Sequence, residues 1–224
     1  MQGLQILATG AQTLVEDGGR RGYAHLGVPR AGAFDTRAWR LANRLVGNSP
    51  DAAVLESLGG GLTVEALGHL TIAVTGAVGD VHIDARTSAT NMPVHLAPGS
   101  RVRLGMPRAG IRYYLALSGG IRVRPALGSR SHDTLGGVGP AALQEGQVLT
   151  AGAERVGPPL VDHVAPVEPA TTFNVLPGPD ADEDTLSALL AGTWDLDPQS
   201  DRIGVRLRGS PLRSETLSLP SKPM

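Results

Sequence analysis

The sequence predicts a mainly β protein, an antiparallel barrel or sandwich with two or so short helices. Three observations support this fold class. Short apolar segments recur along the chain and are separated at close intervals by Gly, Pro, Asn or Asp. The segment Arg101–Leu104 alternates polar and apolar residues, as a half-buried strand does. Only two stretches have the apolar spacing of a helix, so strands are expected to form most of the core.

The expected strands follow one another closely through the first two thirds of the chain. They are Leu4–Leu7, Thr13–Val15, Ala52–Ser57, Leu62–Ala66, Leu70–Thr75, Val81–Asp84, Arg101–Leu104, Ile111–Leu117 and Gln147–Leu149. Two more are expected later, at Phe173–Leu176 and Ile203–Leu207.

The two expected helices have recognisable ends. The first is Thr36–Val46, which Asp35 is expected to cap and which Gly47 follows as a C′ glycine. The second is Glu183–Ala191, with leucines on one face and Gly192 behind it. Acidic residues before the second helix match the preference of a helix N-terminus for negative charge.

Length and composition limit the organisation of the chain. At 224 residues with 41% hydrophobic content, it is long enough for one large or two modest domains. The proline-rich segment 156–169 is the best linker candidate. It would separate an N-terminal β-barrel part with Gly/Arg loops, residues 1–155, from a shorter β-rich part, residues 170–224.

Charge and residue usage exclude several classes of function. The formal net charge of −1 gives no basis for binding nucleic acid or an anionic membrane. The absence of cysteine excludes disulfides, thiolate zinc sites and a cysteine nucleophile. The histidines lack metal-ligand spacing, so no metal site is expected. With neither a signal-peptide pattern nor a membrane-length apolar run, the expected location is cytoplasmic.

The loop Glu16–Asp35 is the first candidate site. It is rich in glycine and arginine, and the helix expected behind it favours an anion at its N-terminus. Asp17 and Arg20 could orient a polar substrate, although a turn Asp paired to a surface Arg is the simpler alternative. For Asp35 the simpler alternative is a helix N-cap.

Two polar residues stand inside apolar surroundings. Asn43 lies within the first helix, where asparagine is unfavourable unless it bonds something specific, and that partner could be structural. Glu56 ends an apolar strand and is equally compatible with a site carboxylate or a solvated strand end.

A second Gly/Ser/Arg loop spans residues 127–137. Ser129 and Arg130 could cradle a carboxylate or a phosphate, and Asp133 lies in the same loop. The run Ser131-His132-Asp133 is not interpreted as a catalytic triad, because a triad depends on geometry and adjacent residues rarely form one.

A resemblance to a known family rests on motifs along the whole chain. They are Gly10–Thr13, Asp17–Arg20, Gly27–Pro29, Gly32–Asp35, Leu41–Asn48, Leu55-Glu56, Ser118–Gly120, Leu127–Arg130, Asp133 and Leu176–Pro179. In this order they resemble the C subunit of 5-oxoprolinase, from a family also labelled allophanate hydrolase subunit 2, KipA-type protein and biotin-dependent carboxyltransferase domain.

The resemblance implies a cyclophilin-like β-barrel and an ATP-dependent enzyme complex that opens the lactam of 5-oxoproline to glutamate. The implied partners are an A subunit of lactam-utilisation type and a KipI-type B subunit (allophanate hydrolase subunit 1). The implied cofactor is ATP with Mg as its counter-ion, and no biotin is expected on this chain. Related urea carboxylases transfer a carboxyl group from carboxybiotin to urea, so one fold supports more than one chemistry.

Site residues follow from matching the motifs. Arg20 and Arg130 are expected to bind anionic groups, and Asp17, Asp35 or Glu56 to orient substrate or act as base. The full set expected to act in catalysis is Asp17, Asp35, Glu56 and Asp133, and the set expected to bind substrate or ATP is Gly18, Arg20, Gly27, Gly32, Asn43, Ser129 and Arg130.

Two alternatives stay open: an allophanate hydrolase or urea-type carboxyltransferase component, and a non-catalytic KipA-type regulator that binds a KipI-type partner. Departures from the family pattern include Glu16 in place of Gln and Ala31 in place of Ser. The family also continues beyond Met224, so the second part is expected to be incomplete.

Overall fold

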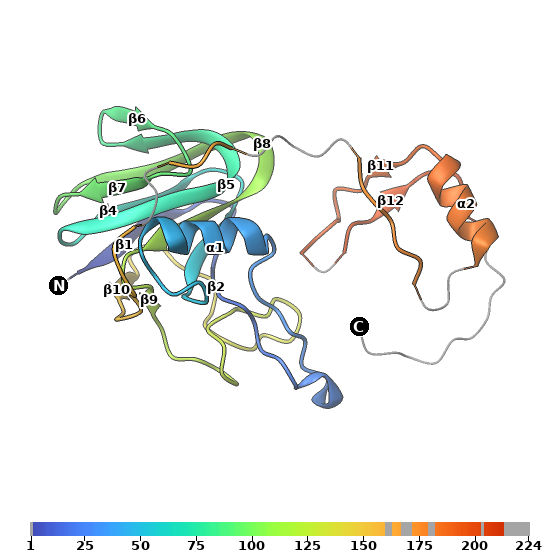
Figure 1. Ribbon diagram of the computed structural model, residues 1–224, viewed down its shortest axis with the longest axis horizontal. Coiled ribbons are helices and arrows are strands. Elements are labelled where there is room, and N and C mark those ends of the chain that lie inside the picture. The colour runs from blue at the N-terminus through green and yellow to red at the C-terminus, as the bar shows by residue number, and fades with distance from the viewer. Residues whose placement is uncertain (1, 160–162, 167–171, 179–181, 203, 213–224) are drawn as a thin grey trace. The chain divides into compact units, whose positions relative to one another are not determined.

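The computed structural model describes residues 2–159, 163–166, 172–178, 182–202 and 204–212. The chain divides into two compact units, Met1–Pro169 and Ala170–Met224, coloured from blue to orange and from orange to red in Figure 1. No helix among the described residues is both long enough and apolar enough to cross a membrane.

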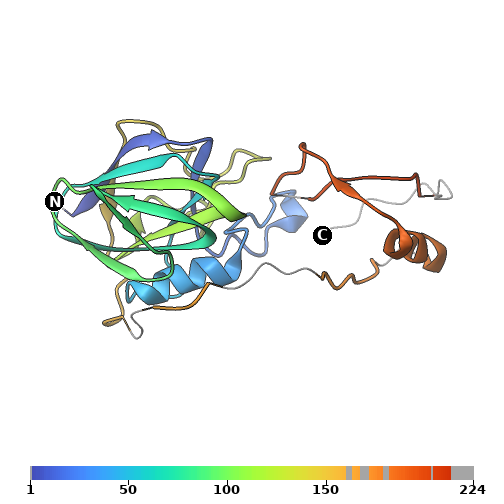
Figure 2. The same ribbon diagram turned by 90° about the horizontal axis from the view of Figure 1, so that it is seen from above.

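The first unit is a nearly closed, barrel-like antiparallel sheet with one helix against it (Figures 1 and 2). Its strands pair in the order β2-β3-β8-β4-β1-β10-β9, and β5 pairs with β6, β7 and β8. The strands are β1 Gly3–Thr9, β2 Gln12–Glu16, β3 Val54–Leu58, β4 Leu62–Ala66, β5 Leu70–Ile83, β6 Arg86–Ser88, β7 Pro93–Leu96, β8 Arg101–Leu117, β9 Ile121–Arg122 and β10 Val148–Ala151. The prediction of a mainly β barrel with two short helices is confirmed.

Two long strands replace four predicted ones. The single strand β5 contains Leu70–Thr75 and all of Val81–Asp84 except Asp84, and β8 likewise joins Arg101–Leu104 to Ile111–Leu117. The pairing of β5 with β8 shifts register between Gly76 and Val81. Gly76 and Gly79 therefore lie at bulges within the ladder and not in turns. Gly76 has φ +90°, and a Cβ there would lie 2.4 Å from the Arg112 carbonyl oxygen.

The alternation of side chains along β5 and β8 builds two apolar layers. Ile72 and Leu115 belong to the cluster inside the barrel, whereas their neighbours Ala73 and Tyr114 belong to a second cluster beneath the helix. That helix is α1, Thr36–Leu45, which lies along the outside of the sheet in Figures 1 and 2. It contributes buried residues that include Trp39, Ala42 and Leu45.

The proline-rich segment contributes to the first unit. Val164 packs against the cluster under α1, and its backbone N–H donates to the Asn91 carbonyl (3.0 Å). Arg155 forms an isolated antiparallel bridge with Asn48, next to the C-terminal end of α1. The loop after α1 and the start of the proline-rich segment therefore lie together.

The second unit contains α2 (Glu183–Ala191) and the short pair β11 (Asp195–Leu196) and β12 (Leu207–Arg208). Asp182 caps α2 by accepting a hydrogen bond from the Thr185 backbone N–H (2.7 Å), and no residue of this helix is buried. The predicted strand Phe173–Leu176 is wrong, because this segment pairs with no described strand. Of the predicted strand 203–207, only Leu207 lies in a strand, and Ile203 is outside the described residues.

Candidate functional site

Asp17 fastens the two Gly/Arg loops together. One carboxylate oxygen accepts hydrogen bonds from the Gly19 N–H (2.8 Å) and from the hydroxyls of Ser129 (2.6 Å) and Ser131 (2.7 Å). The other oxygen accepts from the Arg130 N–H (2.6 Å). The side chain is buried, and four donors already satisfy it. Asp17 therefore holds the second loop in place, and Ser129 serves the same contact.

Arg20 points into the second loop and not toward open space. Its Nη2 donates to the carbonyls of Ser131 and Val138, and its side chain is only 2% exposed. Its Nε and Nη1 have no hydrogen-bond partner among the described residues. Arg20 thus connects the two ends of residues 131–138 through their backbone carbonyls.

Glycines allow the first loop to fold back on itself. Gly32 has φ +100°, and a Cβ there would lie 3.0 Å from the Gly19 nitrogen and 3.1 Å from the Gly18 carbonyl carbon. Gly27 plays a different part, because it closes the short 3-10 helix η1 (Ala24–Leu26) in a left-handed conformation, with nothing within 4 Å of an added Cβ.

Asp35 and Glu56 fix the start of α1 to the sheet. The Asp35 side chain caps the helix by accepting from the N–H groups of Arg37 (2.9 Å) and Ala38 (3.0 Å), so the N-cap interpretation is confirmed. The Asp35 N–H in turn donates to the Tyr114 hydroxyl (2.7 Å). The pKa of Tyr114 is raised above its ordinary range, mainly because the hydroxyl is buried and also because the Glu56 carboxylate lies nearby.

Glu56 is almost fully buried and is held from two sides. It accepts from the Phe34 N–H (2.8 Å) and forms an ion pair with Arg112 (3.1 Å), whose guanidinium also lies 5.3 Å from the centre of the Phe34 ring. This arrangement pins the segment before α1 against strands β3 and β8. Glu56 is therefore a buried, paired carboxylate and not a solvated strand end.

Asn43 and Asp133 also have contacts within the fold. Asn43 is fully buried; its amide donates to the Ala52 carbonyl (2.8 Å) and accepts from Asn48 (3.0 Å). This is the structural partner that helix-interior asparagine requires. Asp133 accepts from the N–H groups of Leu135 (3.1 Å) and Gly136 (3.0 Å) and so closes the turn that follows it.

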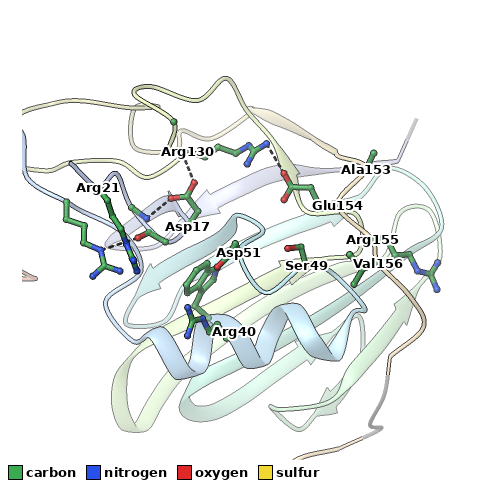
Figure 3. Close-up of a pocket in the computed structure, with 15 residues that line it drawn as sticks. Asp17, Arg21, Arg40, Ser49, Asp51, Arg130, Ala153, Glu154, Arg155 and Val156 are labelled. Atoms are coloured by element: carbon green, nitrogen blue, oxygen red, sulfur yellow. Dashed lines mark hydrogen bonds and ion pairs between the residues drawn. The ribbon is translucent and has the colours of Figure 1, made fainter. Parts of the chain in front are cut away.

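An open cavity of about 730 Å³ lies between the two loops, α1 and the segment after β10 (Figure 3). In Figure 3, Arg40 projects from α1 on one side, and Arg130 and Glu154 lie across from it. The lining residues are Asp17, Gly18, Gly19, Arg21, Arg30, Trp39, Arg40, Ser49, Asp51, Gly128, Arg130, Ala153, Glu154, Arg155 and Val156. Five arginines face three carboxylates, so the cavity is positive and suited to a carboxylate or a phosphate.

Trp39 forms part of the cavity wall. Its indole N–H donates to the Ala52 carbonyl (2.7 Å), and the Arg40 guanidinium lies 5.5 Å from its ring centre. A Cβ on Gly18 would stand 3.3 Å from the Trp39 ring, so Gly18 lets the loop approach the indole closely. The first loop and α1 are therefore closely packed at this wall.

The structure separates the predicted site residues into two groups. Asp17, Gly18 and Arg130 line the large cavity, and Gly32 lines a smaller one of about 130 Å³ beside it. The other predicted residues do not line the large cavity: Arg20, Gly27, Asp35, Asn43, Glu56, Ser129 and Asp133.

Sequence reasoning missed several residues that line the large cavity. Arg21 and Arg30 stand in the same glycine-rich loop, where their type and neighbours were the available signal. No local sequence motif marks the other charged residues, and only the fold brings them to the cavity: Arg40, Asp51, Glu154 and Arg155. No group of three or more His, Cys, Asp or Glu that could hold a metal ion occurs among the described residues.

The chain belongs to the family described as carboxyltransferase domain, subdomain A and B, whose model matches residues 26–224. It is 36% identical to the C subunit of 5-oxoprolinase from Escherichia coli (strain K12) over 219 residues, or 95% of this chain and 71% of the relative. It is 31% identical to urea amidolyase of Lachancea kluyveri, over 92% of this chain but 12% of the relative. These relatives confirm the resemblance that the motifs indicate.

Solved structures agree with the sequence relatives. The crystal structure of TTHA0988 superposes with a TM-score of 0.84 at 34% identity, covering 94% of this chain and 80% of that chain. Urea amidolyase of K. lactis superposes with a TM-score of 0.80 at 31% identity, covering 92% of this chain and 14% of that chain. The barrel-like fold is therefore shared with both groups of proteins.

Proposed function

We propose that this chain is a subunit of an ATP-dependent 5-oxoprolinase complex that opens the lactam of 5-oxoproline to glutamate. The main support is the 36% identity to the C subunit of 5-oxoprolinase from Escherichia coli, across 71% of that relative. In this proposal the chain acts only together with an A subunit of lactam-utilisation type and a KipI-type B subunit.

The charge of the large cavity supports this function. A 5-oxoprolinase must hold a substrate carboxylate and a polyphosphate, and both are anions. Five arginines from four parts of the first unit line the cavity, together with only three carboxylates. ATP fits this donor set on charge; it supplies the phosphoryl group that activates the unreactive amide. Its Mg ion would enter with the phosphates.

The proposal gives the carboxylates of the two loops a positioning role. Asp17 accepts a hydrogen bond from the backbone N–H of Arg130 at 2.6 Å, and so fixes the backbone position from which the Arg130 side chain extends. Asp35 and Glu56 hold the start of α1, the helix that presents Arg40 to the cavity. Among the anion-binding arginines expected from the sequence, Arg130 is the one that faces the cavity, so it is the best residue with which to test the site.

The test is ATP-dependent glutamate release from 5-oxoproline by this chain in complex with both partner subunits. Arg130→Ala should lower kcat/KM by about 10²-fold or more if the guanidinium binds the reacting substrate. Arg101→Ala is the matched control, because Arg101 pairs with Glu65 on the surface and lines no part of this cavity. Full activity of the Arg130 variant in an assembled complex would place the chemistry elsewhere.

A second function, urea-type carboxyl transfer, is favoured by the 31% identity to urea amidolyase. It requires a biotinyl group supplied by another chain or domain. Urea-dependent consumption of carboxybiotin by the assembled complex, without glutamate release from 5-oxoproline, would favour this alternative.

A further inference from the structure

Two cavities of the first unit share one ion pair. Beside the 730 Å³ cavity lies a second one of about 490 Å³, lined by Ile121, Arg122 and residues 151–154. Arg130, Ala153 and Glu154 line both. Arg130 Nη2 donates to Glu154 Oε1 at 2.7 Å, and the two side chains are 30% and 28% exposed. The pair thus stands at the boundary between the cavities, open to solvent.

The backbone on both sides of the pair is fixed by the fold. Asp17 accepts the Arg130 N–H at 2.6 Å. The Glu154 N–H donates to the Gly119 carbonyl (2.9 Å), and the Glu154 carbonyl accepts from the Ser49 N–H (2.8 Å). Gly120 has φ +73°, and a Cβ there would lie 3.0 Å from Glu154 Oε2, so the carboxylate rests on a bare backbone.

The ion pair occupies only part of the hydrogen-bonding capacity of the two side chains. A guanidinium carries five N–H donors and a carboxylate about four acceptor positions. Here they are joined by one contact, between Arg130 Nη2 and Glu154 Oε1. The Arg130 guanidinium is a donor and the Glu154 carboxylate is an acceptor, and both are adjacent and partly exposed. They match a ligand that carries an acceptor and a donor on one edge.

We infer that Arg130 and Glu154 together recognise the amide edge of the substrate, Arg130 donating to its C=O and Glu154 accepting from its N–H. This inference rests on the proposed function and names the substrate class for it. In a five-membered lactam the ring forces the N–H and C=O onto the same edge, and urea presents the same arrangement. An open-chain trans amide points them in opposite directions, so the pair selects lactams and ureas over ordinary peptide-like amides.

A chemical double-mutant cycle tests this inference. One ligand is 5-oxoproline, and the other is its lactone, in which oxygen replaces the ring N–H at nearly the same size. Binding of both is measured by calorimetry, without ATP, to the assembled complex. Because a hydrogen bond to a charged acceptor is strong, the wild type should prefer the lactam by about tenfold to hundredfold. In Glu154→Ala that preference should fall close to one.

The matched control is Glu65→Ala, which removes the carboxylate of another Glu–Arg pair (2.9 Å) away from both cavities. It should keep the full preference for the lactam. Circular dichroism and co-purification establish that each variant is folded and assembled. Equal binding of lactam and lactone by the wild type, or an unchanged preference in Glu154→Ala, would overturn the inference while leaving the proposed function intact.

Measuring urea binding to the same complexes tests the inference independently of the 5-oxoprolinase proposal. A complex that binds urea but not 5-oxoproline, and loses urea in Glu154→Ala, would support recognition of the amide edge and contradict the 5-oxoprolinase proposal. Binding of neither ligand by the wild type would overturn the inference itself.

Discussion

Removal of the Asp17 carboxylate should destabilise the first unit strongly. Asp17→Ala leaves four donors without their acceptor: two backbone N–H groups and two serine hydroxyls. The hydroxyls can rotate to other acceptors, whereas the N–H groups of Gly19 and Arg130 cannot turn without moving the loop. A buried donor without a partner costs about 1–3 kcal/mol. We therefore expect a loss of about 2–5 kcal/mol in the free energy of unfolding.

Asp17→Asn should be milder and should identify the cause. The amide oxygen can still accept from Gly19 and the two serines, but its NH2 group then faces the Arg130 N–H, donor against donor. The expected loss is about 1–2 kcal/mol. Asp80→Ala is the control, because Asp80 is an exposed carboxylate that pairs with the exposed Arg108 at 2.7 Å. It should cause no measurable change.

The assay follows urea unfolding by tryptophan fluorescence. The chain has two tryptophans, Trp39 in α1 and Trp194 in the second unit. A Trp194→Phe background makes the signal report the first unit alone, which avoids treating two units as one transition. An Asp17→Ala variant that unfolds at the same urea concentration as Asp80→Ala would refute the view that Asp17 fastens the loops.

Three further outcomes use the same assay. Asp35→Ala removes the cap of α1 and should cost about 1 kcal/mol, read from Trp39. Tyr113→Phe should stabilise by about 1 kcal/mol, because the buried Tyr113 hydroxyl has no partner among the described residues. Burial raises the folded-state pKa of Tyr114, so its contribution to stability is fully present below the ordinary value of 10.0 and is lost as pH rises above it, by about 1.4 kcal/mol per pH unit. Because burial also raises the pKa of Tyr113, Tyr114→Phe should reduce the slope of stability against pH and not abolish it. Urea midpoints between about pH 9 and 11 measure it.

The sequence alone determined what depends on local patterns. Helix α1 was predicted with its cap at Asp35, because N-cap preference and helical spacing act over a few residues. Most strands of the barrel were predicted near their observed positions for the same reason. The glycines within β5 and β8 were misread as turns, because a glycine at a bulge and a glycine at a turn are alike in sequence.

Only the tertiary structure decided which charged residues face the cavity. Arg20 and Arg21 are adjacent and chemically identical, yet Arg20 braces the second loop and Arg21 lines the cavity. The difference arises from hydrogen bonds between residues more than one hundred positions apart, such as Asp17 with Ser131. Glu154 has no motif around it, and its place beside Arg130 depends on the loop that Asp17 holds. Such contacts depend on chain topology, which local composition does not encode.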